Sequence, residues 1–401
     1  MKKPELLAPA GDLERLKYAL HYGADAVYIG GPNLGLRANA INFTFEEIKQ
    51  GTEYAHQRNK KVYVTVNIVL HNKEIPEVLE YLKQLEKCNI DAIIVSDLTI
   101  IEIALKHTNL EVHLSTQAST MNYETCKFYK ELGVTRIVLA REMSKQEIQE
   151  IKRHVDIELE CFIHGAMCAG ISGRCAMSNV LTARDANRGG CSQICRWDFD
   201  LKNKNQEYLE GDKPFTFCAK DLSLLKYLPD MVNLNVDSFK IEGRMRSIYY
   251  IATIVWVYRH AIDEYFKNPK TYSYNKTYEY ILRNCANRDS VVQFFNGVND
   301  ESCGYYNGRT EISNQDFLGI VLDYEKEHKL ALVEMRNYFK IGDQAEVFGP
   351  NTEPYLFKIE QIYDENEDSI EVVRHPKQIV KIFLPIKVNP YDLIRLKSWQ
   401  K

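Results

Sequence analysis

Apolar runs of strand length alternate with amphipathic helical stretches along the first two-thirds of the chain. Most of these runs are apolar throughout, which is typical of parallel strands that are buried on both faces. The predicted strands are Glu5–Ala10, Ala26–Gly31, Lys61–Ile68, Ala92–Asp97, Glu111–Ser119, Arg136–Glu142, Ile157–His164 and Ser238–Arg244. The predicted helices between them are Leu13–Tyr22, Thr44–Gln57, Pro76–Cys88, Asn122–Leu132, Lys145–His154 and Leu222–Val232. This order predicts an α/β fold with a TIM-like barrel, and an open doubly wound sheet is the alternative because a count of strands does not establish closure.

A different pattern begins at Phe317, where short alternating strands separated by turns run to the end of the chain. About 85 residues of this kind predict a small antiparallel β-barrel over residues 317–401. We therefore expect a catalytic barrel over residues 1–267, which includes a long apolar helix at Ile248–Phe266, and a connector over residues 268–316 with few helix or strand signals.

Polar or small residues follow the apolar run at the end of each predicted strand. Examples are Asn67, Ser115, Gln117, Arg141, His164, Glu242 and Arg244. Any strand that leaves a core becomes polar, so one such residue carries little information. The carboxyl ends of barrel strands meet at one face, however, and this is the face where TIM barrels build their active sites.

Composition excludes several classes of protein. The 401 residues are 45% hydrophobic and 26% charged, which excludes disordered and collagen-like chains. The net charge of −4 provides no overall cationic field for nucleic acid or anionic lipid. The longest apolar run, Ile248–Tyr258, is too short for a bilayer, which needs about 20 residues. Because no apolar signal region follows Met1, we expect a cytoplasmic protein with no membrane partner.

The cysteines are clustered. Six of the ten lie in the segment 161–218, which we interpret as an insert in the barrel. Cys168, Cys175, Cys191 and Cys195 have the spacing C-x6-C-x15-C-x3-C. Four thiolates can hold either zinc or an iron–sulfur cluster. The absence of paired C-x2-C motifs favours a cluster, while zinc and unligated thiols stay open; Cys218 is the substitute for Cys195 as fourth ligand.

Other candidate residues lie beside these cysteines. His164 could orient a substrate, ligate a metal or act as an acid or base, or it could be a hydrogen-bonded histidine at a strand end. Arg174 lies in the cysteine-rich loop, and arginine suits carboxylate or phosphate groups, unless it pairs with a nearby aspartate. Lys240, Glu242 and Arg244 form a second charged group at the end of the eighth predicted strand.

Several longer motifs resemble peptidase family U32, the collagenase-like family. They are ELLAPAGDLERLKYALHYGADAVYIGG at Glu5–Gly31, HLSTQAS at His113–Ser119, FIHGAMCAGISGRC at Phe162–Cys175 and DSFKIEGRMRS at Asp237–Ser247. GLRANAINFT at Gly35–Thr44 and ARDANRGGCSQICRWDFDL at Ala183–Leu201 are similar to the branch of this family that hydroxylates tRNA. The resemblance covers most of the predicted barrel.

The resemblance implies a specific reaction and cofactor. Members of this branch install the hydroxyl of 5-hydroxyuridine at the wobble uridine of tRNA, with prephenate as co-substrate. Relatives carry a [4Fe–4S] cluster, and the matching positions here are Cys168, Cys175, Cys191 and Cys195. The expected partners are tRNA and prephenate, and a homo-oligomer or a paralogous partner chain is open.

The preferred hypothesis assigns roles around the barrel mouth. The expected catalytic residues are His164, Asn67, Gln117 and Glu242, and the expected substrate-binding residues are Arg37, Ser115, Arg141, Arg174, Lys240 and Arg244. One alternative is a peptidase in which Cys168 or a bound metal activates the attack and His164 is the base. A second alternative is an RNA-binding subunit whose cysteines hold structural zinc.

Overall fold

A closed ring of eight parallel strands forms the centre of the molecule in the computed structural model, which describes residues 2–36, 42–205, 207, 214–306 and 317–396. The ring strands are β1 (Glu5–Pro9), β2 (Ala26–Gly30), β3 (Lys61–Val66), β4 (Ala92–Val95), β5 (Glu111–Leu114), β6 (Arg136–Val138), β7 (Glu158–Gly165) and β9 (Ser238–Ile241). Strand β9 pairs in parallel with both β1 and β7, which closes the ring. The predicted TIM-like barrel is therefore confirmed, and the open sheet is excluded.

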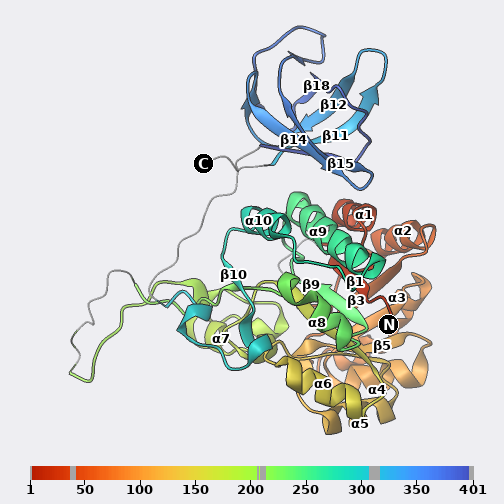
Figure 1. The fold of residues 1–401 in the computed structure, drawn as a ribbon. Helices are drawn as coiled ribbons and strands as arrows, with labels where there is room; N and C mark the ends of the chain where they lie inside the picture. Colours follow the sequence, from red (N-terminus) through yellow and green to blue (C-terminus); the bar gives the residue numbers. More distant parts are fainter. Residues whose placement is uncertain (1, 37–41, 206, 208–213, 307–316, 397–401) are drawn as a thin grey trace.

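Helices surround the ring on its outside (Figure 1). They are α1 (Leu13–His21), α2 (Phe45–His56), α3 (Ile75–Lys87), α4 (Leu98–His107), α5 (Tyr123–Leu132), α6 (Lys145–His154), α8 (Leu228–Asn233) and α9 (Ile248–Lys267). The main hydrophobic core lies between these helices and the outward faces of the strands. Capping boxes begin two helices: the side chains of Thr44 and Ser144 accept from the third backbone N–H of α2 and α6.

The cysteine-rich segment leaves the barrel after β7 and returns at β9. It contains the short helix α7 (Met177–Thr182) and the strand β8 (Asp221–Ser223), which runs antiparallel to the end of β7. The predicted helix over Leu222–Val232 was wrong in its first half, because β8 occupies the first residues and α8 begins only at Leu228.

The segment after α9 also differs from the expectation of few regular elements. It forms helix α10 (Lys276–Cys285) and strand β10 (Ser290–Val291), which pairs with β8. Tyr278 on α10 donates a hydrogen bond to Glu264 of α9 and lies edge-on to Trp256. The apolar side of the amphipathic helix α10 therefore covers the outer face of α9.

Short antiparallel strands form a barrel-like domain at the end of the chain, as expected. The strands are β11 (Phe317–Glu325), β12 (Leu330–Met335), β13 (Phe339–Lys340), β14 (Gln344–Gly349), β15 (Thr352–Lys358), β16 (Ile362–Tyr363), β17 (Val372–Val373), β18 (Ile379–Phe383) and β19 (Leu393–Leu396). Seven of them form one curved sheet around a separate hydrophobic core, and β13 pairs with β17.

The barrel-like domain packs against helices α1 and α9 (Figure 1). The Tyr22 hydroxyl donates a hydrogen bond to the Tyr391 carbonyl at 2.8 Å, and the Tyr249 and Phe317 rings stack with their centroids 5.0 Å apart. These contacts attach the domain to the outer helices of the barrel. Among the described helices, none combines the length and apolar character needed to span a bilayer.

Candidate functional site

A cavity of about 220 Å³ opens at the carboxyl ends of the barrel strands. Its wall combines inward-facing strand residues with residues of the cysteine-rich segment. The predicted residues that line it are Asn67, Ser115, Gln117, Arg141, Lys240, Glu242, Arg244, Cys168, Cys175, Cys191 and Cys195. The barrel therefore brings together most of the predicted site at one place.

All four predicted metal-ligating cysteines line this cavity. Cys168 and Cys191 are exposed, and Cys175 and Cys195 are half-buried. Burial raises the pKa of Cys195 to about 11, and the thiols of Cys168, Cys218 and Cys191 add to this shift. Cys218 is buried and does not line the cavity. It raises the pKa of Cys195, however, and therefore lies near the four thiols that do line it.

Zinc and a four-iron cluster place different demands on the four thiols. A tetrahedral zinc site with Zn–S bonds of about 2.3 Å holds its four sulfurs within about 4 Å of one another. Among the described residues, no three His, Cys, Asp or Glu side chains form a group that could hold a single metal ion. The thiolates of a four-iron cluster each bind a different iron atom and stand farther apart. The four thiols that line the cavity are the residues that would hold such a cluster.

Side-chain amides provide the uncharged polar groups of the wall. The Asn67 amide nitrogen donates to Ser115 Oγ at 3.4 Å. In the described part of the chain, the buried oxygens Asn67 Oδ1 and Gln117 Oε1 have no hydrogen-bond partner. A buried polar atom without a partner costs free energy, so both oxygens are acceptors that a bound molecule or water in the cavity would satisfy. They suit the N–H groups of a nucleobase.

Cationic side chains form another part of the wall. Arg141 lies with its guanidinium 3.8 Å from the centre of the Phe162 ring and 3.6 Å from a carboxylate oxygen of Glu242. Arg244 donates to Thr65 Oγ1 at 2.9 Å and packs directly against Gly30, where a β-carbon would collide with its guanidinium. Arg141 is thus held by an aromatic ring and a carboxylate, and Arg244 by a hydroxyl, and both residues line the cavity.

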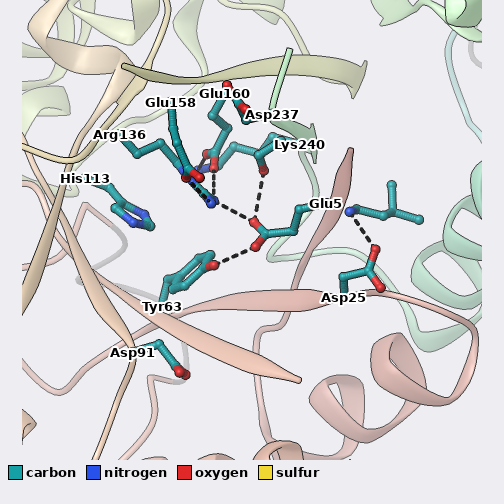
Figure 2. Close-up of polar contacts among 12 residues, drawn as sticks. Glu5, Asp25, Tyr63, Asp91, His113, Arg136, Glu158, Glu160, Asp237 and Lys240 are labelled. Carbon is teal, nitrogen blue, oxygen red and sulfur yellow. Dashed lines mark hydrogen bonds and ion pairs between the residues drawn. The ribbon is translucent and has the colours of Figure 1, made fainter. Parts of the chain in front are cut away.

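A network of charged groups fills the barrel below the cavity (Figure 2). Lys240 donates to Glu160 at 2.6 Å, and Arg136 contacts Glu160 at 3.3 Å, Glu5 at 2.6 Å and Glu158 at 2.8 Å. Glu160 is completely buried. Burial alone would raise the pKa of Glu160, but the charges of Lys240 and Arg136 outweigh it and lower that pKa. The network therefore fixes Lys240 at the floor of the cavity.

His164 lies outside the cavity, contrary to its predicted role there. Its ring is buried on the outer side of the barrel, where Nδ1 is 3.4 Å from the Tyr258 hydroxyl of α9. Burial and the charge of Arg246 lower its pKa to about 3, so it is neutral at physiological pH. In the described part of the chain no histidine lines the cavity, and the cysteine–histidine pair of the peptidase hypothesis is not formed there.

Two of the arginines predicted to bind substrate are not found among the described residues that line the cavity. Arg174 lines a separate hollow rather than the cavity. Arg37 lies outside the described residues. Sequence reasoning missed Tyr28, Thr65 and Phe162, which line the cavity in the middle of predicted strands. Tyrosine, threonine and phenylalanine are common in strands, so the residue types gave no signal. Only a separation of two residues from a polar strand end, as between Thr65 and Asn67, could have placed such a residue on the inward face.

The family of the chain follows from two matching family models. Residues 11–303 match the model of peptidase family U32, and residues 313–395 match the model of its C-terminal domain. The chain belongs to peptidase family U32. The cavity lies within the region that matches the U32 model, and the barrel-like domain matches the model of the family's C-terminal domain.

Relatives in the U32 family carry different names. The chain is 48% identical to tRNA hydroxylation protein P1 of Bacillus subtilis, over 98% of this chain and 95% of that protein. It is 39% identical to a 23S rRNA 5-hydroxycytidine synthase of Escherichia coli, over 65% of this chain and 39% of that protein. It is 30% identical to a collagenase of Porphyromonas gingivalis, over 97% of this chain and 96% of that protein.

Proposed function

We propose that this chain is an RNA-modifying enzyme that hydroxylates the wobble uridine of tRNA to 5-hydroxyuridine. The names of the Bacillus and Escherichia relatives support hydroxylation of RNA bases. The observation that carries the proposal is the cavity, in which four thiols face two amide oxygens without partners. A base must leave its stack to enter such a cavity, and a loop of tRNA presents bases that are already unstacked.

The proposed cofactor is a [4Fe–4S] cluster held by Cys168, Cys175, Cys191 and Cys195. When bound, it would supply one-electron redox chemistry beside the base. Cys218 is the alternative to Cys195, because the Cys218 thiol lies close enough to raise the pKa of Cys195. The thiols come from one segment that follows β7, so the cluster would also fix the shape of that segment.

The chain's own residues would position the two substrates. One of the two amide oxygens, Asn67 Oδ1 or Gln117 Oε1, would accept a hydrogen bond from N3–H, the single N–H donor of the uracil ring in uridine. Prephenate, the proposed co-substrate, carries two carboxylates, and Arg141 and Arg244 present forked donors to the same cavity. Glu242 lies between Arg141 and Tyr28, with the Tyr28 hydroxyl donating to it at 3.3 Å. It would hold Arg141 in place for the acid.

Anaerobic purification tests this proposal. The expected protein contains iron and sulfide in equal amounts and converts uridine to 5-hydroxyuridine in tRNA when prephenate is added, as measured by mass spectrometry of nucleosides. Omission of prephenate is the control and should abolish the product. A protein with iron and sulfide that leaves tRNA unchanged would contradict the function, and an active protein that contains only zinc would contradict the cofactor.

Substitution of Gln117 tests the role of the amide wall. Gln117→Ala removes one acceptor for the base, and loss of one buried hydrogen bond corresponds to an activity that is lower by about tenfold. Gln149→Ala, an exposed glutamine on α6, is the matched control and should keep full activity. The measurement is the initial rate of 5-hydroxyuridine formation at saturating prephenate. Equal rates for the two variants would exclude Gln117 from base binding.

A further inference from the structure

A second hollow, of about 470 Å³, lies beside the cavity and has no role in the proposed reaction. Its walls come from the segments after β3 and β4, from helix α5 and from the cysteine-rich segment. The residues that line it are Val69, Ser96, Asp97, Leu98, Tyr129, Arg174 and Asn187. We call it the side hollow.

The side hollow and the cavity share a wall. Ser96 of the side hollow donates from Oγ to the backbone oxygen of Asn67, at 3.2 Å, and Asn67 lines the cavity. The side-chain amide of Asn187 bonds to both the backbone N–H and the backbone oxygen of Cys175, which also lines the cavity. Residues that line the two spaces are therefore in direct hydrogen-bond contact, so the side hollow adjoins the cavity.

The chemistry of the side hollow combines a cation with an aromatic ring. The guanidinium of Arg174 is exposed and makes no hydrogen bond or ion pair to any residue in the described ranges. Tyr129 is half-buried beside it: burial raises the pKa of its phenol, and the charge of Arg174 opposes this shift. The apolar side chains of Leu98 and Val69 remain 53% and 42% exposed.

These groups match the parts of a nucleotide. A guanidinium binds phosphate oxygens, and an aromatic ring with apolar neighbours provides a stacking surface for any base. Asp97 directs its two carboxylate oxygens at the backbone N–H groups of Thr99 and Leu70, at 2.9 and 3.2 Å, and these dipoles partly offset its negative charge. The side hollow therefore offers one cation and one aromatic face beside the cavity.

We propose that the side hollow binds the nucleotide next to the target base, with its phosphate on Arg174 and its base against Tyr129. This inference rests on the proposed function, because it assigns a second subsite to the same RNA. It also gives Arg174 a place in RNA binding that is separate from the binding of the small acid in the cavity.

Binding of an anticodon stem–loop RNA tests the side hollow without any catalytic step. Arg174→Gln should weaken binding about tenfold and make the slope of log K against log salt shallower by about one, since one phosphate contact is lost. Tyr129→Ala should weaken binding by about fivefold or more, and Tyr129→Phe should preserve it, because the ring and not the hydroxyl stacks. Fluorescence anisotropy of a labelled RNA measures both effects.

The matched control is Arg153→Gln. Arg153 is exposed on the last turn of α6, which lies at the opposite end of the barrel from the cavity. Its substitution should leave both the affinity and the salt slope unchanged. Equal losses for Arg174→Gln and Arg153→Gln, or no loss in Arg174→Gln, would overturn the assignment, and so would wild-type affinity in Tyr129→Ala.

The outcome is independent of whether the hydroxylation proposal holds. If the wild-type protein binds the RNA but forms no 5-hydroxyuridine, the reaction is wrong while the side hollow is still tested by the variants. If the protein forms 5-hydroxyuridine and Arg174→Gln binds the RNA as the wild type does, only the side hollow is wrong. A preference of the side hollow for prephenate over RNA would appear as competition by prephenate and would also overturn the proposal.

Discussion

Replacement of Glu160 with alanine is expected to lower the free energy of unfolding by about 3–5 kcal/mol, the usual loss when one partner of a buried ion pair is removed. Glu160 is completely buried and bonds to both Lys240 and Arg136. Arg136 would keep Glu5 and Glu158, but Lys240 would lose its only hydrogen-bonding partner among the described residues. Its ammonium would then face only the rings of Tyr28 and Phe162, 4.6 and 5.5 Å away.

Urea denaturation followed by circular dichroism measures this loss. The double variant Glu160→Leu/Lys240→Met removes both charges and should recover at least half of the lost stability, because no unpaired buried charge remains. The control is Glu102→Ala, which breaks an exposed pair with Lys106 on one helix face and should leave the unfolding midpoint unchanged. A midpoint for Glu160→Ala equal to that of this control would show that the interior charges do not stabilise the barrel.

The architecture of the barrel could be predicted because its signal is local and repeated. Eight short apolar runs with polar ends define eight buried parallel strands, and each was found within a few residues of its predicted position. Helix α4 was missed, because its sequence LTIIEIALKH is apolar on most sides and lacks a clear polar face. The turns of the cysteine-rich segment could not be predicted either, since they depend on contacts with distant strands.

The position of His164 shows where strand periodicity fails. Glu158, Glu160 and Phe162 alternate along β7 and face the barrel interior, and a regular strand would place His164 on the same face. The pairing of β7 with β9 shifts between Phe162 and His164, and such an irregularity moves the next side chain to the opposite face. His164 therefore meets Tyr258 on α9 instead of the cavity. A single inserted residue in the register leaves no clear mark in the sequence.

The charged network inside the barrel was not predicted, because it depends on contacts between different strands. Glu160 lies in a predicted strand that also carries Glu158, and Arg136 is the first residue of another, so these charges do not change the predicted element. Their function depends on neighbours from other strands, namely Glu5 on β1 and Lys240 on β9. Such a network exists only once the ring has closed. By contrast, the four cysteines belong to one segment, and their common location could be predicted from that segment alone.

Replacement of Cys168 with alanine is expected to abolish formation of 5-hydroxyuridine, with a fall of more than about 100-fold, because the redox step loses its cofactor and only the uncatalysed rate is left. The brown absorbance near about 400 nm that is typical of thiolate-bound iron clusters should be lost at the same time. Iron and sulfide analysis after anaerobic purification, together with nucleoside mass spectrometry, measures both effects.

Cys303→Ala is the matched control, because Cys303 is a half-buried thiol that does not line the cavity, and it should retain both iron and activity. The same assays separate the two candidates for the fourth ligand. If Cys195 is the ligand, Cys195→Ser should lose iron and Cys218→Ser should retain it, and the reverse result would assign Cys218. Full iron content and full activity in Cys168→Ala would contradict the cluster, because a cavity lined by the remaining three thiols would then suffice for the reaction.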